Sequence, residues 1–149
     1  MVDEMMASIN KESYEGIKKA NEAKRTPVPL SKLKLGLERG GSDGFFGISA
    51  NPSLGYASDL LSALKGSPIL SEFPELYGIE QKLVNRCIDV KTANRFMELT
   101  KAYEKAAIAS GSGFDMNPSP GNIKNGLITD AMKSTGAAKK GGTSPIDVC

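Results

Sequence analysis

Carboxylate and hydroxyl side chains gather in a glycine-rich run, residues 36–53, which reads GLERGGSDGFFGISANPS. Glu38 and Asp43 could accept a proton or bind a divalent cation, and Ser42 could bind a ligand hydroxyl. Alternating apolar residues over 33–37 predict a strand that ends here, and α/β proteins place polar sites at the carboxyl ends of strands. The alternative is a tight turn in which glycine supplies positive φ. Phosphate-loop glycine patterns do not fit, because Ser42 stands where such a loop needs lysine.

A second pair of carboxylates, Glu72 and Glu75, flanks Pro74 at the end of the run 67–72, which reads SPILSE. That run predicts another strand, so this pair would also lie at a strand's carboxyl end. Paired carboxylates could hold a divalent cation or supply a general base. The alternative is a solvated loop, with Glu75 facing the positive end of a following helix.

Amides and a hydroxyl fill the segment 117–122, which reads NPSPGN. Its two prolines pre-order the backbone at low entropic cost. Asn117, Ser119 and Asn122 therefore suit a polyhydroxylated ligand, although a plain turn explains the segment equally well.

Two lysines, Lys139 and Lys140, precede two glycines near the end of the sequence. Lysine in the last turn of a helix interacts favourably with the helix dipole, and the residues alone favour that interpretation. The charge of Lys140 could instead meet a substrate carboxylate.

Composition excludes several function classes. The chain has 149 residues and no histidine, so it cannot build a Ser-His-Asp or Cys-His apparatus or a histidine-ligated zinc site. Any metal would have oxygen ligands, which suits Mg²⁺, Ca²⁺, Mn²⁺ or Fe²⁺. The net charge of +2 without a basic stripe argues against nucleic acid. No apolar run reaches membrane-spanning length and no signal peptide opens the chain, so we expect a cytoplasmic protein with no membrane partner.

The hydrophobic spacing and the capping residues predict an alternation of helices and strands. Asn51 is expected to cap the first helix after the glycine run, with Leu54, Ala57, Leu61 and Leu64 on its buried face and Gly66 as its C-cap. The expected elements are a charged helix over 3–23, a strand over 33–37, a helix over 51–64, a strand over 67–72, a helix over 77–88, a helix from Asp89 or Thr92 to 109, a loop over 111–125, a helix over 129–138 and a strand over 145–148.

This order predicts an α/β fold, a layered Rossmann-like domain with a small, mainly parallel sheet flanked by helices. Three parts are expected: an N-terminal helix over 1–24, a proline-containing linker over 25–32 and the α/β domain over 33–149. We expect the first helix to pack on something outside this chain, and the sequence to be a piece of a longer protein.

Taken together, five segments resemble the altronate/galactarate dehydratase family, and specifically its middle region. The matching stretches are GLERGGSDG at 36–44, GISANP at 47–52, LSEFPELYG at 70–78, NPSPGN at 117–122 and STGAAKKGGT at 134–143. Two departures are present. Arg39 stands where the family usually has cysteine, and the residues after Asn122 differ from the family pattern. An arginine there could grip a carboxylate or sulfonate with its bidentate fork.

The resemblance implies a hydro-lyase that removes water from a sugar acid with a divalent metal, Fe²⁺ or Mn²⁺. It implies catalytic roles for Glu38, Asp43 and Glu75, and metal ligation by Glu38, Asp43 and Glu72. The substrate-binding residues that it implies are Arg39, Ser42, Asn117, Ser119, Asn122 and Lys140. The alternatives are a sulfolactate sulfo-lyase subunit and a non-catalytic domain that binds an acid sugar or metal. Because family members are longer, we expect the isolated chain to be inactive and to need the remaining dehydratase segments or a partner subunit; a homo-oligomer stays open.

Overall fold

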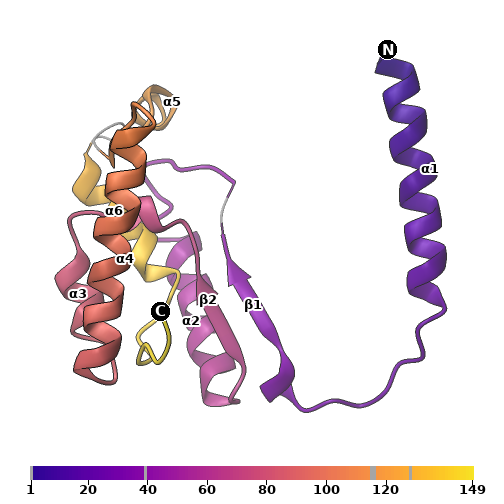
Figure 1. The fold of residues 1–149 in the computed structure, drawn as a ribbon, viewed down its shortest axis with the longest axis horizontal. Coiled ribbons are helices and arrows are strands. Elements are labelled where there is room, and N and C mark those ends of the chain that lie inside the picture. Colours follow the sequence, from indigo (N-terminus) through magenta and orange to yellow (C-terminus); the bar gives the residue numbers. More distant parts are fainter. Residues whose placement is uncertain (1, 39, 115–116, 128) are drawn as a thin grey trace.

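The computed structural model describes residues 2–38, 40–114, 117–127 and 129–149. They form a mixed helix and sheet fold (Figure 1). The regular elements are α1 (Val2–Asn21), β1 (Lys34–Leu37), α2 (Ala50–Ala63), β2 (Ser67–Leu70), α3 (Glu80–Val84), α4 (Val90–Ala109), α5 (Pro120–Lys124) and α6 (Asp130–Lys139). Short 3-10 helices cover Leu30–Lys32 (η1) and Phe73–Leu76 (η2).

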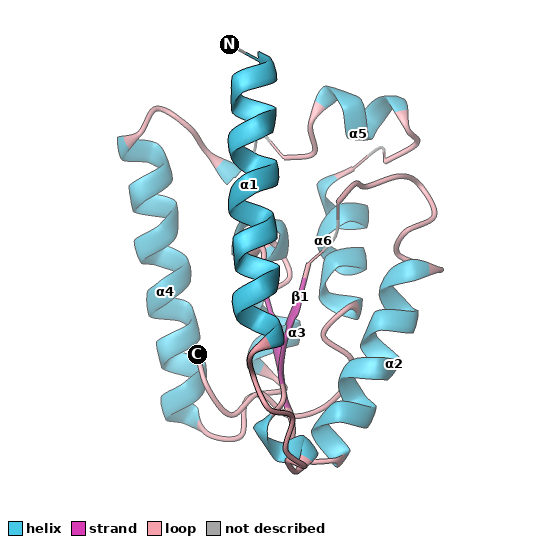
Figure 2. Ribbon diagram, turned by 90° about the vertical axis from the view of Figure 1, so that its right-hand side faces the viewer, coloured by secondary structure: helices cyan, strands magenta, loops and turns pink. Residues whose placement is uncertain are grey.

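The sheet contains the two predicted strands, β1 and β2, and they run parallel. The register pairs Lys34 with Ser67 and Leu37 with Leu70, so both strands end side by side. The Ser71 hydroxyl donates a 2.6 Å hydrogen bond to the Leu37 carbonyl and ties these ends together. Figure 2 shows α4 on one side of the strands and α2 with α6 on the other. With two strands among the described residues, the Rossmann-like layering is not confirmed.

The predicted third strand over 145–148 is wrong for the described structure. Ile146 makes only an isolated parallel bridge with Cys87, in which Ile146 N donates to the Arg86 carbonyl at 2.8 Å. The side chains of this segment alternate as in a strand, but its backbone pairs with a turn after α3 and not with β1 or β2.

The first helix after the glycine run, α2, differs from the prediction in its start and in its buried face. It begins at Ala50, with Ser49 as the N-cap, so Asn51 is a buried residue of the helix and not its cap. Its buried residues are Asn51, Gly55, Ser58 and Leu61, of which the prediction contained only Leu61. The reason is close helix contact: a Cβ on Gly55 would lie 2.1 Å from the Lys139 carbonyl at the end of α6. Small residues, and not leucines, therefore face α6.

Three further boundaries depart from the sequence pattern. The C-cap of α2 is Leu64 and not Gly66; Lys65 takes the left-handed conformation, with φ of 64°, and Gly66 follows it. The helix expected over 77–88 is shorter and covers only α3, because Gly78 takes a φ of 86° before it, and the 3-10 helix η2 precedes that glycine. The loop expected over 111–125 contains the short helix α5, since a proline at a first helical position favours a helix start.

The core lies between η2, α3, α4 and α6. Its buried members are Leu76, Leu83, Phe96, Ala137 and Ala138. Phe73 packs on Phe96 with ring centroids 5.3 Å apart. This core holds η2 and α6 together, and those two elements carry the ionic residues described below.

The N-terminal helix α1 stands apart from the rest of the chain (Figure 1) and has no buried residue. Its apolar side chains, including Met6, Ile9 and Ile17, are about half exposed or more. The predicted helix is confirmed, and its apolar stripe has no partner among the described residues. None of the described helices combines the length and the apolar character needed to cross a membrane.

Candidate functional site

Polar segments meet where β1 and β2 end. The chain leaves β2 through Ser71 and enters Glu72, a non-glycine residue in the left-handed conformation with φ of 65° and ψ of 53°. Such a conformation costs of order 1 kcal/mol for a residue with a Cβ and persists where its surroundings fix it. The helix η2 then begins, with Glu75 in its first turn. Both carboxylates thus arise from one short turn at the carboxyl end of the sheet.

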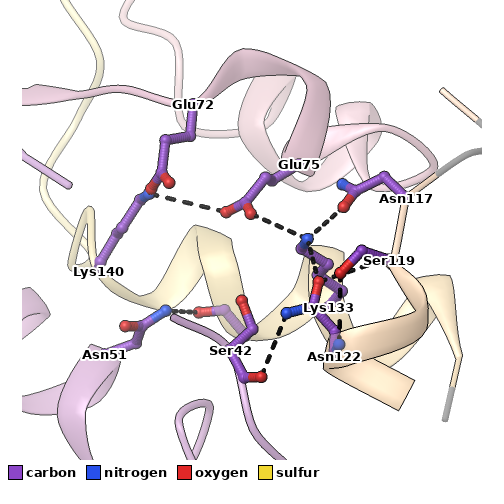
Figure 3. Close-up of polar contacts among 10 residues, drawn as sticks. Ser42, Asn51, Glu72, Glu75, Asn117, Ser119, Asn122, Lys133 and Lys140 are labelled. Carbon is purple, nitrogen blue, oxygen red and sulfur yellow. Dashed lines mark hydrogen bonds and ion pairs between the residues drawn. The ribbon is translucent and has the colours of Figure 1, made fainter. Parts of the chain in front are cut away.

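Lys140, at the end of α6, faces both carboxylates (Figure 3). Its side chain is completely buried, and its ammonium donates to Glu72 Oε2 and lies 3.9 Å from Glu75 Oε2. A buried ammonium needs such compensation, because removal from water strongly disfavours an unpaired charge. Contact between Lys140 and a substrate would therefore require it to leave these carboxylates.

Lys133, also on α6, belongs to the same ionic group, although the sequence analysis did not single it out. Its ammonium lies 3.2 Å from Glu75 Oε1 and donates to Asn122 Oδ1 at 3.0 Å and to Asn117 Oδ1. Seven residues, about two helical turns, separate Lys133 from Lys140, so both lysines lie on one face of α6. That spacing of two lysines on a predicted helix was the available signal.

The segment 117–122 is held in place by capping bonds. Ser119 Oγ accepts from Asn122 N at 3.3 Å, and Asn122 Oδ1 accepts from Ser119 N at 3.2 Å, which is a capping box at the start of α5. Asn122 Nδ2 also donates to the Ser42 carbonyl at 3.3 Å. This last bond joins the segment to the glycine run, eighty residues earlier in the chain.

The structure therefore gathers most of the expected site residues but not all of them. Figure 3 shows the polar cluster, which we define as Ser42, Glu72, Glu75, Asn117, Ser119, Asn122, Lys133 and Lys140. Among the described residues, the Asp43 side chain makes no hydrogen bond or ion pair with the cluster: its Oδ1 accepts from the backbone N–H groups of Phe45 and Phe46, both at 2.8 Å, and so shapes the glycine turn. Glu38 is exposed at the end of β1. Arg39 lies outside the described residues.

The proposed metal ligands do not form a metal site in this geometry. Among the described residues, no three acidic or cysteine side chains are close enough together to hold a metal ion. Glu72 and Glu75 face ammonium groups, which would repel a cation, and Oδ1 of Asp43 already accepts from two backbone N–H groups. The donor set in the described part of the chain thus does not fit a divalent cation.

A second charged group secures the chain just after Lys140. The carboxylate of Asp59, on α2, accepts hydrogen bonds of 2.6–3.0 Å from the backbone N–H and the hydroxyl groups of Thr143 and Ser144. Desolvation alone would raise the pKa of Asp59, but the bonds from Ser144 and Thr143 outweigh it and lower that pKa to about 2. Arg86 clamps the same turn by donating to the Gly141 and Ser144 carbonyls. Burial lowers the pKa of its guanidinium, against the opposing effect of Asp59.

The polar cluster lies outside the larger cavity. A cavity of about 560 Å³ is lined mainly by apolar surface, to which Leu70, Leu83, Phe96 and the C-terminal residues 144–149 contribute. A second cavity, of about 360 Å³, lies beside Phe46 and α6. The cluster is therefore a polar wall between elements and not the lining of either cavity.

The described residues thus form a mixed helix and sheet fold that carries the polar cluster. Sequence comparison shows the family to which this chain belongs. The sequence model described as "D-galactarate/Altronate dehydratase, C-terminal" matches residues 30–149, including every member of the polar cluster. The chain belongs to this family, as its motifs predicted, but the match is to the model of the C-terminal part and not to the middle region that the motifs suggested.

Relatives agree with this assignment. The chain is 41% identical over 148 residues to the altronate dehydratase of Bacillus subtilis, a match that covers 98% of this chain and so includes α1. It is 43% identical to the altronate dehydratase of Escherichia coli over 83% of this chain, and 35% identical to the galactarate dehydratase (L-threo-forming) of the same organism over 87%. The chain spans only 29%, 25% and 25% of these three proteins.

Proposed function

We propose that this chain forms part of the active site of a hydro-lyase that removes water from a polyhydroxy carboxylic acid of the altronate or galactarate type. The observation that carries the proposal is the polar cluster. Four segments of the family pattern, 36–44, 70–78, 117–122 and 134–143, contribute side chains or backbone groups to one polar wall. Family membership supports the general chemistry.

Elimination of water from such an acid needs a base for the proton α to the carboxylate, and an acid for the leaving hydroxide. Glu75 is our candidate for the base, with Glu38 and Asp43 as the other predicted participants. Both Glu75 oxygens point to ammonium groups, so acceptance of a proton requires one of these ion pairs to lengthen. Asn117, Ser119 and Asn122 are the predicted contacts to substrate hydroxyls, and Ser42 reaches the same wall through its backbone.

The divalent Fe²⁺ or Mn²⁺ implied by the resemblance stays a prediction. Since the donors in the described residues do not fit it, we propose that its ligands lie in the other segments of the longer dehydratase, and no step above passes through it. Those segments are also the partners we propose, and the activity of this chain alone is predicted to be absent. The cytoplasmic location and a homo-oligomeric state stay predictions as well.

A second candidate reaction has one observation in its favour. The chain is 31% identical over 91% of its length to the (2R)-sulfolactate sulfo-lyase subunit beta of Chromohalobacter salexigens. Elimination of sulfite from sulfolactate would use the same base, with sulfite in place of hydroxide as the leaving group. The two candidates therefore differ in the acid substrate that the polar cluster binds. A domain that binds its acid without catalysis is the remaining alternative.

Ligand titration followed by NMR tests the proposal. Galactarate is compared with adipate, which has the same six-carbon diacid chain without hydroxyls, and with sulfolactate. We expect galactarate or altronate to shift the signals of Asn117, Ser119 and Asn122, while adipate leaves them unchanged. Equal shifts with adipate, or no shift with either sugar acid at the solubility limit, would refute the proposal. Shifts with sulfolactate alone would support the sulfo-lyase candidate instead.

A further inference from the structure

The ammonium of Lys133 has all three of its N–H donors matched by acceptors. Glu75 Oε1, Asn117 Oδ1 and Asn122 Oδ1 come from η2, from the segment before α5 and from α5 itself. The Lys133 side chain is only 8% exposed, so water competes weakly for these bonds. No donor of Lys133 is left over for a ligand.

This arrangement fixes which way the two amides face. An ammonium donates but cannot accept, so both amides must turn their oxygens toward Lys133 and their NH₂ groups away from it. The NH₂ group of Asn122 donates to the Ser42 carbonyl. The NH₂ group of Asn117 has no hydrogen-bond partner among the described residues, and Asn117 is half-buried at the edge of the cluster.

The charges of the cluster cancel. Lys133 and Lys140 supply two positive charges, and Glu72 and Glu75 supply two negative charges. No uncompensated cation of the cluster is therefore available for a substrate carboxylate. A neutral wall with an oriented NH₂ donor and the hydroxyl of Ser119 is suited to the hydroxyl groups of a ligand.

We propose that Lys133 is a positioning residue that orients the Asn117 amide, so that this wall binds the hydroxyl-bearing part of the acid and not its carboxylate. The inference rests on the proposed function for the identity of the ligand. The orientation of the amide, by contrast, depends only on contacts within the chain. Carboxylate binding then falls to residues outside the cluster.

Lys133→Met tests the positioning role, because it keeps a long unbranched side chain, one atom shorter than lysine, and removes all three donors. In the wild type we expect the Asn117 side-chain NH₂ to be rigid in ¹⁵N relaxation. In Lys133→Met we expect it to become mobile and the galactarate Kd to rise at least about ten-fold, which is about 1.4 kcal/mol. Lys124→Met, an exposed lysine at the end of α5, is the matched control and should change neither quantity. A rigid Asn117 amide in Lys133→Met would overturn the inference.

Asn117→Asp covers the case in which Lys133→Met fails to fold. The substitution keeps an oxygen for Lys133 and removes the NH₂ donor. We expect an unchanged or higher Tm and at least about ten-fold weaker binding of galactitol, whose lack of charge excludes simple repulsion. Undiminished galactitol binding by Asn117→Asp would overturn the inference. If the wild type binds no sugar acid, the proposed function fails, whereas the relaxation of the Asn117 amide still decides the role of Lys133.

Discussion

Removal of the buried ammonium of Lys140 should destabilise the domain more than any other single lysine substitution at the end of α6. The side chain of Lys140 is 0% exposed, and its partners Glu72 and Glu75 are 21% and 14% exposed. Lys140→Met leaves Glu72 without its ammonium partner, and Glu75 keeps Lys133. Breaking a buried ion pair from one side costs about 3–5 kcal/mol, and the partial exposure of Glu72 favours the lower end, about 3 kcal/mol.

That loss is large beside the total stability of about 5–15 kcal/mol that is typical of a domain. For a folded unit of this size it corresponds to a fall in Tm of about 10 °C. Urea unfolding followed by circular dichroism measures the free energy, and a thermal scan measures Tm. Because the unpaired carboxylate causes the cost, Lys140→Met combined with Glu72→Gln should recover part of the lost stability.

The neighbouring lysine supplies the control. Lys139 Nζ donates to a single neutral acceptor, the Gly47 carbonyl, at 3.0 Å, and its side chain is only partly buried. Lys139→Met should cost about 1 kcal/mol, the usual net value of one hydrogen bond. If Lys140→Met costs no more than Lys139→Met, or if Glu72→Gln worsens it, then the ion pairs do not stabilise the domain as argued.

Three further predictions concern the scaffold around the cluster. Because the pKa of Asp59 falls from 3.8 to about 2 on folding, its contribution is complete above pH 3.8 and is lost as the pH falls toward 2. The pKa shift limits this contribution to the free energy of unfolding to about 2 kcal/mol, and solvent screening reduces it to about 1 kcal/mol. In urea unfolding across this pH range, Asp59→Asn should lose this part of the pH dependence of stability. Gly55→Ala should cost about 1–3 kcal/mol, because its Cβ would meet the Lys139 carbonyl at 2.1 Å, whereas Gly16→Ala in α1, with nothing within 4 Å, should not destabilise; thermal scans of both decide. Lys65→Gly should raise the free energy of unfolding by about 1 kcal/mol, since Lys65 has φ of 64° at the end of α2, and an unchanged or lower value would contradict this.

Local signals in the sequence located several elements well. Asp89, one of the two residues predicted to begin the helix, is the N-cap of α4, and its side chain accepts from Thr92 N at 2.7 Å. Thr129 caps α6 in the same way, accepting from Met132 N at 3.2 Å. The two parallel strands were also predictable, because short apolar runs followed by turn residues mark strand ends. In each case the information lies within a few residues of the boundary.

Non-local contacts account for what the sequence pattern could not predict. The buried face of α2 follows from the close approach of Gly55 to α6, which no apolar periodicity encodes. Apolar and polar residues alternate over 145–148 as in a strand, but the backbone of this segment pairs with Cys87, in the turn that follows α3. Asp43 was predicted as a metal ligand, and only the folded turn reveals that its Oδ1 accepts from two backbone N–H groups.

Lys133 was missed for a related reason. A lysine on a predicted helix normally belongs to a solvated face, and its burial here depends on Glu75 and two asparagines that arrive from other segments. The family motifs contained those partners, and the seven-residue spacing to Lys140 placed both lysines on one side of α6. Only the combination of that spacing with the carboxylates at the strand end would have predicted a buried ionic wall.

The same ion pairs that define the candidate site also join the elements that carry it. Glu72 and Glu75 lie on the turn after β2, both lysines lie on α6, and Asn122 connects to the glycine run through Ser42. A substitution in this cluster therefore changes stability and ligand binding together, so a loss of activity alone cannot identify a catalytic role. Asn117 is the member whose NH₂ group makes no internal bond among the described residues, and its replacement by aspartate should separate the two effects. If binding falls while Tm holds for that variant and for no other in the wall, the hydroxyl-binding function belongs to Asn117 and the lysines serve to hold it in place.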